Sequence, residues 1–407
     1  MKNMTIVMVG DVPPDPAYTG GQVLARIMAG MPDAHFQFLW FNQLGLPPPA
    51  SIPNNCTIVG EYRILQGPVF EFIARALQSL VRRGRRLGRL FDGLLQLGQV
   101  ACVGVRLGRE LRRRGGDRLW FVLQGDRPMV CYTIAQTMAG RPYVLHQWDP
   151  VSWWMGHRTL PRAYQTWIKG LLRRFEARAF LNVVPSAVWQ AKLITEGKTA
   201  VRADNFIEAR LLKGRRLLAL REPGVLHAVF LGEFYASAEL VAIVGRLIEH
   251  SVACGKRLVV HYFGSGQAPQ IVGCRFVAHG FIDRDALIES VSKWELALLP
   301  YPVEARFEET ARLSFPSKVR VYMAAGLPIL SNAPDFSGVH AFLAREYAEF
   351  YCNMRLAGDF DAFMGRIDLC GYAEASKRFD AASQLVLREF SDEAELVPLK
   401  RLIEDGI

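Results

Sequence analysis

The chain has 407 residues, half of them hydrophobic, and a formal net charge of +10 at pH 7. Its length favours two domains of ordinary size. The longest apolar run, residues 93–105, is too short and too polar to cross a bilayer, which requires about 20 apolar residues. Seven scattered cysteines without Cys-x-x-Cys spacing indicate neither a disulfide framework nor a zinc site. Because an apolar segment follows Met1 closely, without a signal-type cleavage site, we expect a cytoplasmic protein.

Short apolar runs alternate with longer helical stretches along the chain. The first series lies at residues 5–9, 36–40, 57–59, 119–123, 143–145 and 182–184, and the second at 225–231, 258–263, 276–277, 296–299 and 328–330. This alternation predicts α/β domains built on parallel sheets that helices cover on both faces. We therefore expect two similar domains in tandem, with a break near residues 206–224.

A pair of glycines, Gly20 and Gly21, follows the first predicted strand. Paired glycines let the backbone approach a ligand at the carboxyl end of a strand, just before a helix whose N-terminus favours anions. The pair therefore predicts a ligand-binding loop, and an ordinary tight turn is the alternative.

Residues 61–118 hold thirteen arginines against five acidic side chains, a local charge of +8. Apolar residues are interleaved with them, which is typical of basic amphipathic helices that bind an anionic membrane surface or a phosphate-rich ligand. A solvated helix face is the alternative, and no nucleic-acid-binding signature accompanies the charge. We predict a membrane surface as the partner and no nucleic acid. The arginines expected to contact it are Arg82, Arg83, Arg85 and Arg86.

The strand at residues 143–145 ends in His146, and Asp149 follows three residues later. An imidazole at a strand end can contact a sugar hydroxyl, and a nearby carboxylate can hold its orientation. A structural histidine is the alternative.

Five of the eight tryptophans lie close to this strand end, at 148, 153, 154, 167 and 189. Indole rings stack on sugars and settle at membrane interfaces, so Trp153 and Trp154 are predicted acceptor contacts, with core packing as the alternative.

The segment 315–330 reads FPSKVRVYMAAGLPIL. Pro316 fits the first turn of a helix, so backbone amides, the Ser317 hydroxyl and the Lys318 ammonium gather at its positive end. Gly326 would end the helix, and an apolar strand follows. The segment therefore predicts an anion site beside a sheet, and a plain helix–strand junction is the alternative.

The same segment resembles the donor site of GT-B glycosyltransferases of the retaining family 4. Members often read Pro-Ser-Lys, two variable residues, Glu-Tyr and Ala-Ala-Gly-x-Pro, and the likeness extends over nearly all of the chain except residues 45–118. The resemblance implies the GT-B fold, in which two Rossmann-like domains with parallel sheets face a central cleft. It also implies an N-terminal acceptor-binding domain at 1–206, a donor-binding domain at 207–380, and a C-terminal helix at 381–407 that returns to the first domain.

In function, the resemblance implies transfer of a sugar from a nucleotide-diphosphate sugar to an acceptor, with retention and without a metal or other cofactor. It assigns His146 and Asp149 to the catalytic set. The implied donor-binding residues are Gly21, Gly264, Glu309, Phe315, Ser317, Lys318 and Tyr322. We further expect a glycan or polyprenyl-linked acceptor, a role in bacterial polysaccharide or glycoconjugate synthesis, and peripheral attachment to the inner face of the plasma membrane.

The chain departs from the family at the donor site. Glu233 and Ala238 stand where members usually carry an Arg and a Lys that clamp the diphosphate, and Leu313 and Val321 stand where they carry two glutamates. Glu308 and Glu309 lie close by and can supply a carboxylate. These departures leave two alternatives open: a catalytically weak relative that acts as a scaffold subunit at the membrane, and a nucleotide-sugar 2-epimerase of the same fold.

Overall fold

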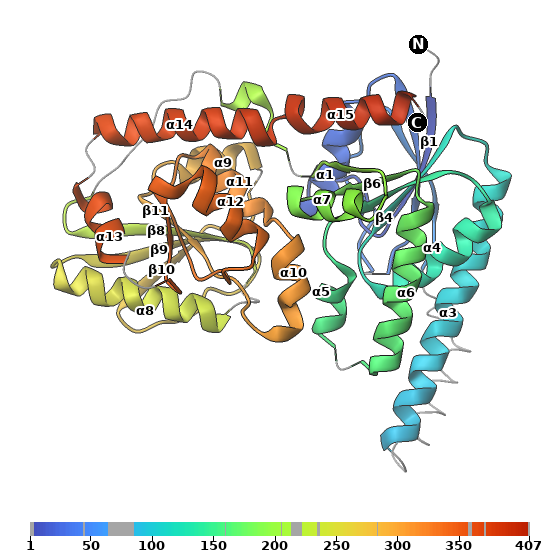
Figure 1. Ribbon diagram of the computed structural model, residues 1–407, viewed down its shortest axis with the longest axis horizontal. Helices are drawn as coiled ribbons and strands as arrows, with labels where there is room; N and C mark the ends of the chain where they lie inside the picture. The colour runs from blue at the N-terminus through green and yellow to red at the C-terminus, as the bar shows by residue number, and fades with distance from the viewer. Residues whose placement is uncertain are drawn as a thin grey trace. The chain divides into compact units, whose positions relative to one another are not determined.

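A computed structural model describes residues 4–43, 45–63, 85–158, 160–204, 206–212, 222–233, 237–282, 284–356, 360–369 and 372–405 (Figure 1). The chain divides into two compact units. Unit 1 comprises Met1–Val184, Gln190–Arg202 and Leu402–Ile407, and unit 2 comprises Pro185–Trp189 and Ala203–Arg401. Within the described residues, none of the helices combines the length and apolar character that a bilayer span requires.

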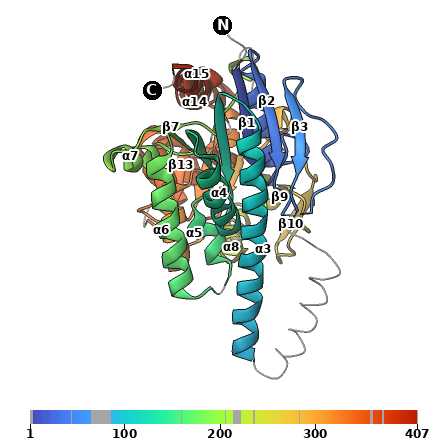
Figure 2. The ribbon, with the colours of Figure 1, turned by 90° about the vertical axis from the view of Figure 1, so that its right-hand side faces the viewer.

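Unit 1 is built on a parallel sheet of seven strands in the order β3-β2-β1-β4-β5-β6-β7 (Figure 2). The strands are β1 (Met4–Gly10), β2 (Ala34–Trp40), β3 (Cys56–Glu61), β4 (Arg118–Leu123), β5 (Tyr143–Gln147), β6 (Leu181–Val184) and β7 (Ala200–Arg202). The strand order reverses between β1 and β4. In open α/β sheets, ligands bind at the carboxyl ends of the strands on either side of such a reversal.

Helices connect these strands: α1 (Thr19–Ala29), α3 (Arg85–Arg113), α4 (Asp126–Ala139), α5 (Val151–Gly156), α6 (Arg162–Arg178) and α7 (Ala187–Thr195). The long helix α3 runs beside α4 (Figure 2). Its close approach depends on Gly104 and Gly108, where a Cβ would lie 2.9 Å from the Cys131 carbonyl oxygen and 2.8 Å from Met138 Cβ. Over residues 97–113 of α3, the part whose side chains are described, the apolar side chains pack into the core and the exposed side is basic.

Unit 2 has a parallel sheet of six strands in the order β10-β9-β8-β11-β12-β13. The strands are β8 (Val225–Leu231), β9 (Arg257–Phe263), β10 (Cys274–Ala278), β11 (Leu296–Leu299), β12 (Ile329–Ser331) and β13 (Tyr351–Asn353). The α-helices are α8 (Ser237–Ala253), α9 (Arg284–Val291), α10 (Glu308–Leu313), α11 (Ser317–Ala324), α12 (Gly338–Glu346), α13 (Phe360–Leu369), α14 (Tyr372–Phe390) and α15 (Asp392–Asp405). Among the residues that the structure describes, short 3-10 helices lie at Ala209–Leu211, Ala305–Phe307 and Ala348–Phe350.

A buried ion pair ties α11 to α15 within unit 2. Arg320 and Glu395 are both 0% exposed, and the guanidinium donates to Glu395 Oε2 at 2.7 Å. Its other terminal nitrogen donates to the Pro185 carbonyl at 2.9 Å, and the Phe390 ring lies 4.7 Å from the guanidinium carbon. The helix that begins at Ser317 is therefore fixed from its buried side.

Candidate functional site

The predicted anion site lies at the carboxyl edge of the unit 2 sheet. Lys318 stands in the first turn of α11, and its Nζ lies 4.9 Å from the centroid of the Phe230 ring. Gly232, directly after β8, has φ +92° and would place a Cβ 3.5 Å from that Nζ, so the backbone passes close to the ammonium. Burial lowers the pKa of Lys318 to about 8, and the Glu233 carboxylate opposes this. The side chain is therefore mainly charged at pH 7.

Two other predicted donor residues pack beneath this helix start. The Tyr322 hydroxyl accepts from the Leu231 amide and donates to the Leu298 carbonyl, both at 3.0 Å, so it joins the ends of β8 and β11. Phe315 is also buried, with its ring edge-on to Phe342 at 5.2 Å. Both side chains hold the helix start in place. Direct donor contact by either stays a prediction.

A carboxylate, that of Glu233 after β8, is held at this edge by the turn after β9. The Ser265 hydroxyl donates to Glu233. Gly264 is tightly enclosed, because a Cβ there would overlap the Tyr262 hydroxyl, which also accepts from the Gly266 amide at 3.0 Å. The position where a cationic clamp was expected thus holds an acidic side chain that is anchored by a serine.

The positions of the two missing glutamates are apolar and buried, with Leu313 at 6% and Val321 at 4% exposure. The nearby Glu308 is exposed and accepts from Arg312 at 3.0 Å. Glu309 is half-buried on α10. A glutamate at 313 or 321 would bury a carboxylate in this core, so the departure from the family pattern is consistent with the local packing.

Three histidines on neighbouring strands form a chain that sequence reasoning missed. Nδ1 of His227 on β8 lies 3.0 Å from Nε2 of His261 on β9. Nδ1 of His261 lies 2.9 Å from Nε2 of His279, which follows β10 at the carboxyl edge. The Trp294 indole stacks on His261 with ring centroids 3.5 Å apart. The chain therefore crosses the sheet diagonally and ends at an exposed imidazole.

The charges around the three histidines favour one set of tautomers. Burial lowers the pKa of His261 to about 3, assisted by His227, His279 and Arg275, so its ring is neutral at pH 7. The Glu222 carboxylate lies 3.5 Å from His227 Nε2 and favours a proton there. A neutral imidazole donates with one nitrogen and accepts with the other. Each ring then donates through Nε2, which leaves His279 Nδ1 as an acceptor at the edge.

In unit 1, the glycine pair and the His146 segment come together through Trp148. A Cβ on Gly20 would overlap the Trp148 ring, and one on Gly21 would overlap the carbonyl oxygens of Asp15 and Pro13. The Trp148 indole N–H donates to His146 Nε2 at 3.1 Å. The protein's own packing thus requires both glycines, and ligand contact by Gly21 stays a prediction.

His146 is fully buried, whereas Asp149 is half-buried just beyond it. The contact to His146 Nε2 comes from Trp148, which sequence reasoning had treated only as part of the tryptophan cluster. Trp154 lies against Gly125, where a Cβ would be 3.3 Å from the indole, and the Trp153 ring stands edge-on to His157 at 4.3 Å. Their proposed catalytic and acceptor roles stay predictions.

The structure does not describe the side chains of the four arginines that were predicted to contact a membrane. Arg82 and Arg83 lie outside the described residues, and Arg85 and Arg86 begin α3 but their side chains are not described. In the described half of α3, the arginines at 106, 109, 112 and 113 are exposed. Arg113 and Arg114 both pair with Glu110, at 2.8 and 2.6 Å.

Asp11 is a further residue to which the sequence analysis assigned no role. It follows β1 at the reversal of the strand order and is 1% exposed. Gln43 Nε2 donates to it at 2.9 Å, and the Gln124 amide, oriented with its nitrogen toward Asp11, donates to both carboxyl oxygens at 3.2 Å. Burial raises the pKa of Asp11 to about 7, although the Gln43 bond opposes this. The group therefore titrates near neutrality, as proton-exchanging residues often do.

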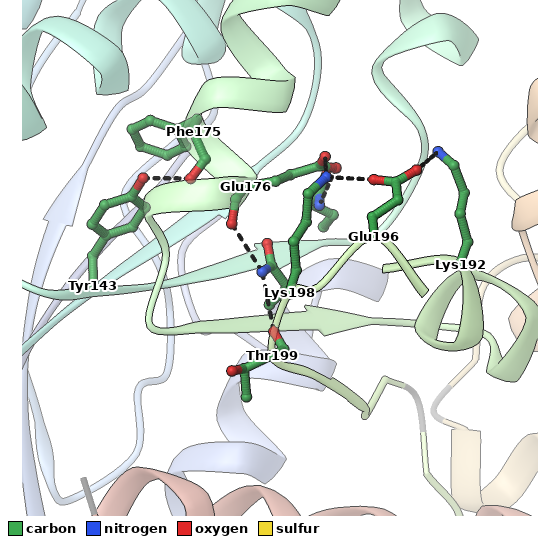
Figure 3. A network of polar contacts seen from close by, with 9 residues as sticks. Tyr143, Phe175, Glu176, Lys192, Glu196, Lys198 and Thr199 are labelled. Carbon is green, nitrogen blue, oxygen red and sulfur yellow. Dashed lines mark hydrogen bonds and ion pairs between the residues drawn. The ribbon is translucent and has the colours of Figure 1, made fainter. Parts of the chain in front are cut away.

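A buried charge network supports the end of β5 (Figure 3). Gln147 donates to Glu176 at 3.2 Å, and Lys198 Nζ donates to Glu176 at 2.8 Å and to Glu196 at 2.6 Å. Burial alone would lower the pKa of Lys198, but the two carboxylates raise it. The network joins α6 to the segment before β7 and fixes the residue next to His146.

Comparison with known proteins finds no matching family model and no matching curated protein. Solved structures do match over the whole chain. Sucrose-phosphate synthase from Thermosynechococcus elongatus is 13% identical with a TM-score of 0.63, and 99% of each chain is covered. An α,α-trehalose-phosphate synthase (UDP-forming) from Burkholderia vietnamiensis is 12% identical with a TM-score of 0.62, covering 99% of this chain and 97% of that one. Anabaena HepE, in complex with UDP and glucose, is 14% identical with a TM-score of 0.57, covering 99% of each chain.

At these identities the likeness concerns the fold. Two parallel sheets of seven and six strands, matched along their length by these structures, give the chain the GT-B fold. The fold class predicted from the sequence is thereby confirmed.

Proposed function

We propose that the protein is a glycosyltransferase that moves a sugar from a nucleotide-diphosphate-sugar donor to a glycan or lipid-linked acceptor. The observation that carries the proposal is Lys318, a part-buried ammonium at the start of α11 beside the glycine that follows β8. A helix start and a lysine together favour a diphosphate. The HepE structure, which holds UDP and glucose on the same fold, adds support.

In this proposal the chemistry is mainly electrostatic. Negative charge grows on the leaving diphosphate as the sugar bond breaks, and the first turn of α11, with Ser317 and Lys318, stabilises it. Burial lowers the pKa of Lys318, and Glu233 opposes that lowering and so favours the protonated side chain before the donor binds. His146, held by Trp148, positions the sugar. The leaving phosphate accepts the acceptor's proton, with retention and without a metal or other cofactor, as in the family that the sequence resembles.

The proposed acceptor is a glycan or a polyprenyl-linked saccharide at the inner face of the plasma membrane, in bacterial polysaccharide or glycoconjugate synthesis. The half-buried indoles of Trp153 and Trp154 on α5 and the basic side of α3 support this choice. Changing Arg82, Arg83, Arg85 and Arg86 together to Glu should abolish binding to anionic vesicles. Unchanged vesicle binding would remove the membrane from the proposal.

The donor site is tested by calorimetric titration of the full chain with UDP, GDP, ADP and CMP and with their sugar conjugates. We expect one nucleotide to bind, and Lys318→Ala to weaken it at least tenfold because a buried phosphate contact is lost. Lys377→Ala, an exposed lysine on α14, is the matched control and should leave the affinity unchanged.

Two other results would replace the proposal. If no nucleotide or nucleotide sugar binds, Glu233 and Val321 mark a site that has lost its ligand, and the scaffold alternative follows. If a nucleotide sugar binds and is converted to its 2-epimer without an acceptor, the protein is a 2-epimerase.

A further inference from the structure

A histidine, a cysteine and an aspartate meet at the end of unit 2 opposite Lys318. His250 lies in α8, Cys254 follows that helix directly, and Asp368 lies near the end of α13. Because Cys254 precedes β9, the cluster is at the amino end of the sheet, whereas Lys318 faces the glycine after β8. Helices α8 and α13 occupy the same part of unit 2 (Figure 1). The cluster is thus separate from the proposed donor site.

The three side chains present their ligand atoms to one another. His250 Nε2 lies 3.1 Å from Asp368 Oδ2, Cys254 Sγ lies 3.6 Å from His250 Nε2, and the same sulfur lies 3.8 Å from Asp368 Oδ2. Bond lengths at zinc are about 2.3 Å to sulfur and about 2.0–2.2 Å to nitrogen and oxygen. Tetrahedral angles then place the nitrogen and oxygen about 3.3 Å apart and the sulfur about 3.5 Å from each. Each side of the observed triangle is within about 0.3 Å of this geometry.

The chemistry of the three groups also suits zinc. A thiolate, an imidazole and a carboxylate are the ligand types that Zn²⁺ accepts, and the thiolate disfavours Mg²⁺ and Ca²⁺. Cys254 lies one turn beyond His250, and its amide donates to the His250 carbonyl at 3.0 Å, so the two side chains project on the same side of the helix end. Lys256 Nζ donates to the other carboxyl oxygen, Asp368 Oδ1, at 2.5 Å and therefore orients Oδ2 toward the triangle.

We propose that His250, Cys254 and Asp368 bind one Zn²⁺, with water as the fourth ligand on the exposed side of Cys254. Binding requires the Cys254 thiol to release its proton to solvent, and the sulfur then bonds to the metal as a thiolate. The ion joins the end of α8 to α13 across 114 residues of sequence. It stabilises unit 2 and takes no part in sugar transfer.

The test uses the purified full chain after treatment with a chelator. Titration with Co²⁺ should produce the near-ultraviolet thiolate-to-metal absorption and the visible bands of a tetrahedral site, saturating at one ion per chain, and Zn²⁺ should abolish both. Cys254→Ser should remove the thiolate band. His250→Gln and Asp368→Asn should each weaken binding at least tenfold. Cys102→Ser, at an exposed cysteine in unit 1, is the matched control and should bind like the parent chain.

A parent chain that gives no thiolate band with Co²⁺ would overturn the proposal. So would a band that persists in Cys254→Ser or disappears in Cys102→Ser. His250→Gln keeps both the cysteine and the carboxylate, so it remains informative if the cysteine variant misfolds. Nucleotide binding at Lys318 plays no part in any of these readouts.

Discussion

Breaking the buried pair of Arg320 and Glu395 should strongly destabilise the protein. Glu395→Gln removes the charge that faces a guanidinium with 0% exposure. Losing one partner of a buried ion pair costs about 3–5 kcal/mol, because the remaining charge stays buried. Asp204 Oδ2 lies 4.0 Å from the guanidinium and offsets part of that loss, so we expect about 3 kcal/mol.

Replacing both partners tests the physical reason. The double variant Arg320→Met, Glu395→Leu leaves no buried charge from the pair. It should recover most of the loss, although the Pro185 carbonyl and the Asp204 amide each lose a partner worth about 1 kcal/mol. Arg388→Met is the surface control. Its guanidinium also contacts two glutamates, but its side chain is 61% exposed, so its loss should cost less than about 1 kcal/mol.

Urea unfolding followed by tryptophan fluorescence measures these free energies. The reasoning is refuted if Glu395→Gln costs no more than Arg388→Met. It is equally refuted if the double variant is no more stable than Glu395→Gln, because the loss would then not arise from an unpaired charge.

Three further predictions concern unit 1. Asp11 has a pKa of about 7 when folded and 3.8 in its ordinary state, so the native state binds more protons between these values and stability falls as pH rises. Asp11→Asn should therefore gain stability relative to the parent between pH 4 and pH 7, by at most about 4 kcal/mol in urea unfolding; a constant difference would contradict this. Lys198→Met should cost about 3–5 kcal/mol in the same assay, because Glu176 stays buried without its ion partner; a loss below 1 kcal/mol would disprove the burial argument. Gly21→Ala should lower stability by about 1–3 kcal/mol, because its Cβ would meet backbone that cannot move cheaply; an unchanged melting temperature would refute it.

Alternating apolar runs predicted most strands of the two sheets, and the two strands that were missed share one physical cause. Each predicted run lies on a strand of the structure, but β7 (Ala200–Arg202) and β13 (Tyr351–Asn353) were not predicted. Both are edge strands of three residues. Such strands are too short to show a periodic pattern, and their place depends on the neighbour with which they pair.

The candidate site was predictable only where it rests on local chemistry. The helix start at Ser317 and Lys318 followed from the Pro-Ser-Lys pattern. Arg320, however, was treated as a variable position, since its partner Glu395 is 75 residues away. The chain from His227 to His279 depends on the register of three parallel strands, which no local pattern shows. Asp11 had a recognisable signal, a carboxylate directly after the first strand, that was not used.

The central claim is that Lys318 and the start of α11 stabilise a leaving nucleoside diphosphate. The most direct measurement is the rate at which the full chain releases nucleoside diphosphate from the nucleotide sugar that it binds. We expect measurable release by the parent chain and by Lys377→Ala, and a rate about 10²–10³ lower in Lys318→Ala at saturating donor, as for the loss of one transition-state donor. Release that is equally fast in Lys318→Ala, or absent from the parent chain with every nucleotide sugar, would contradict the claim.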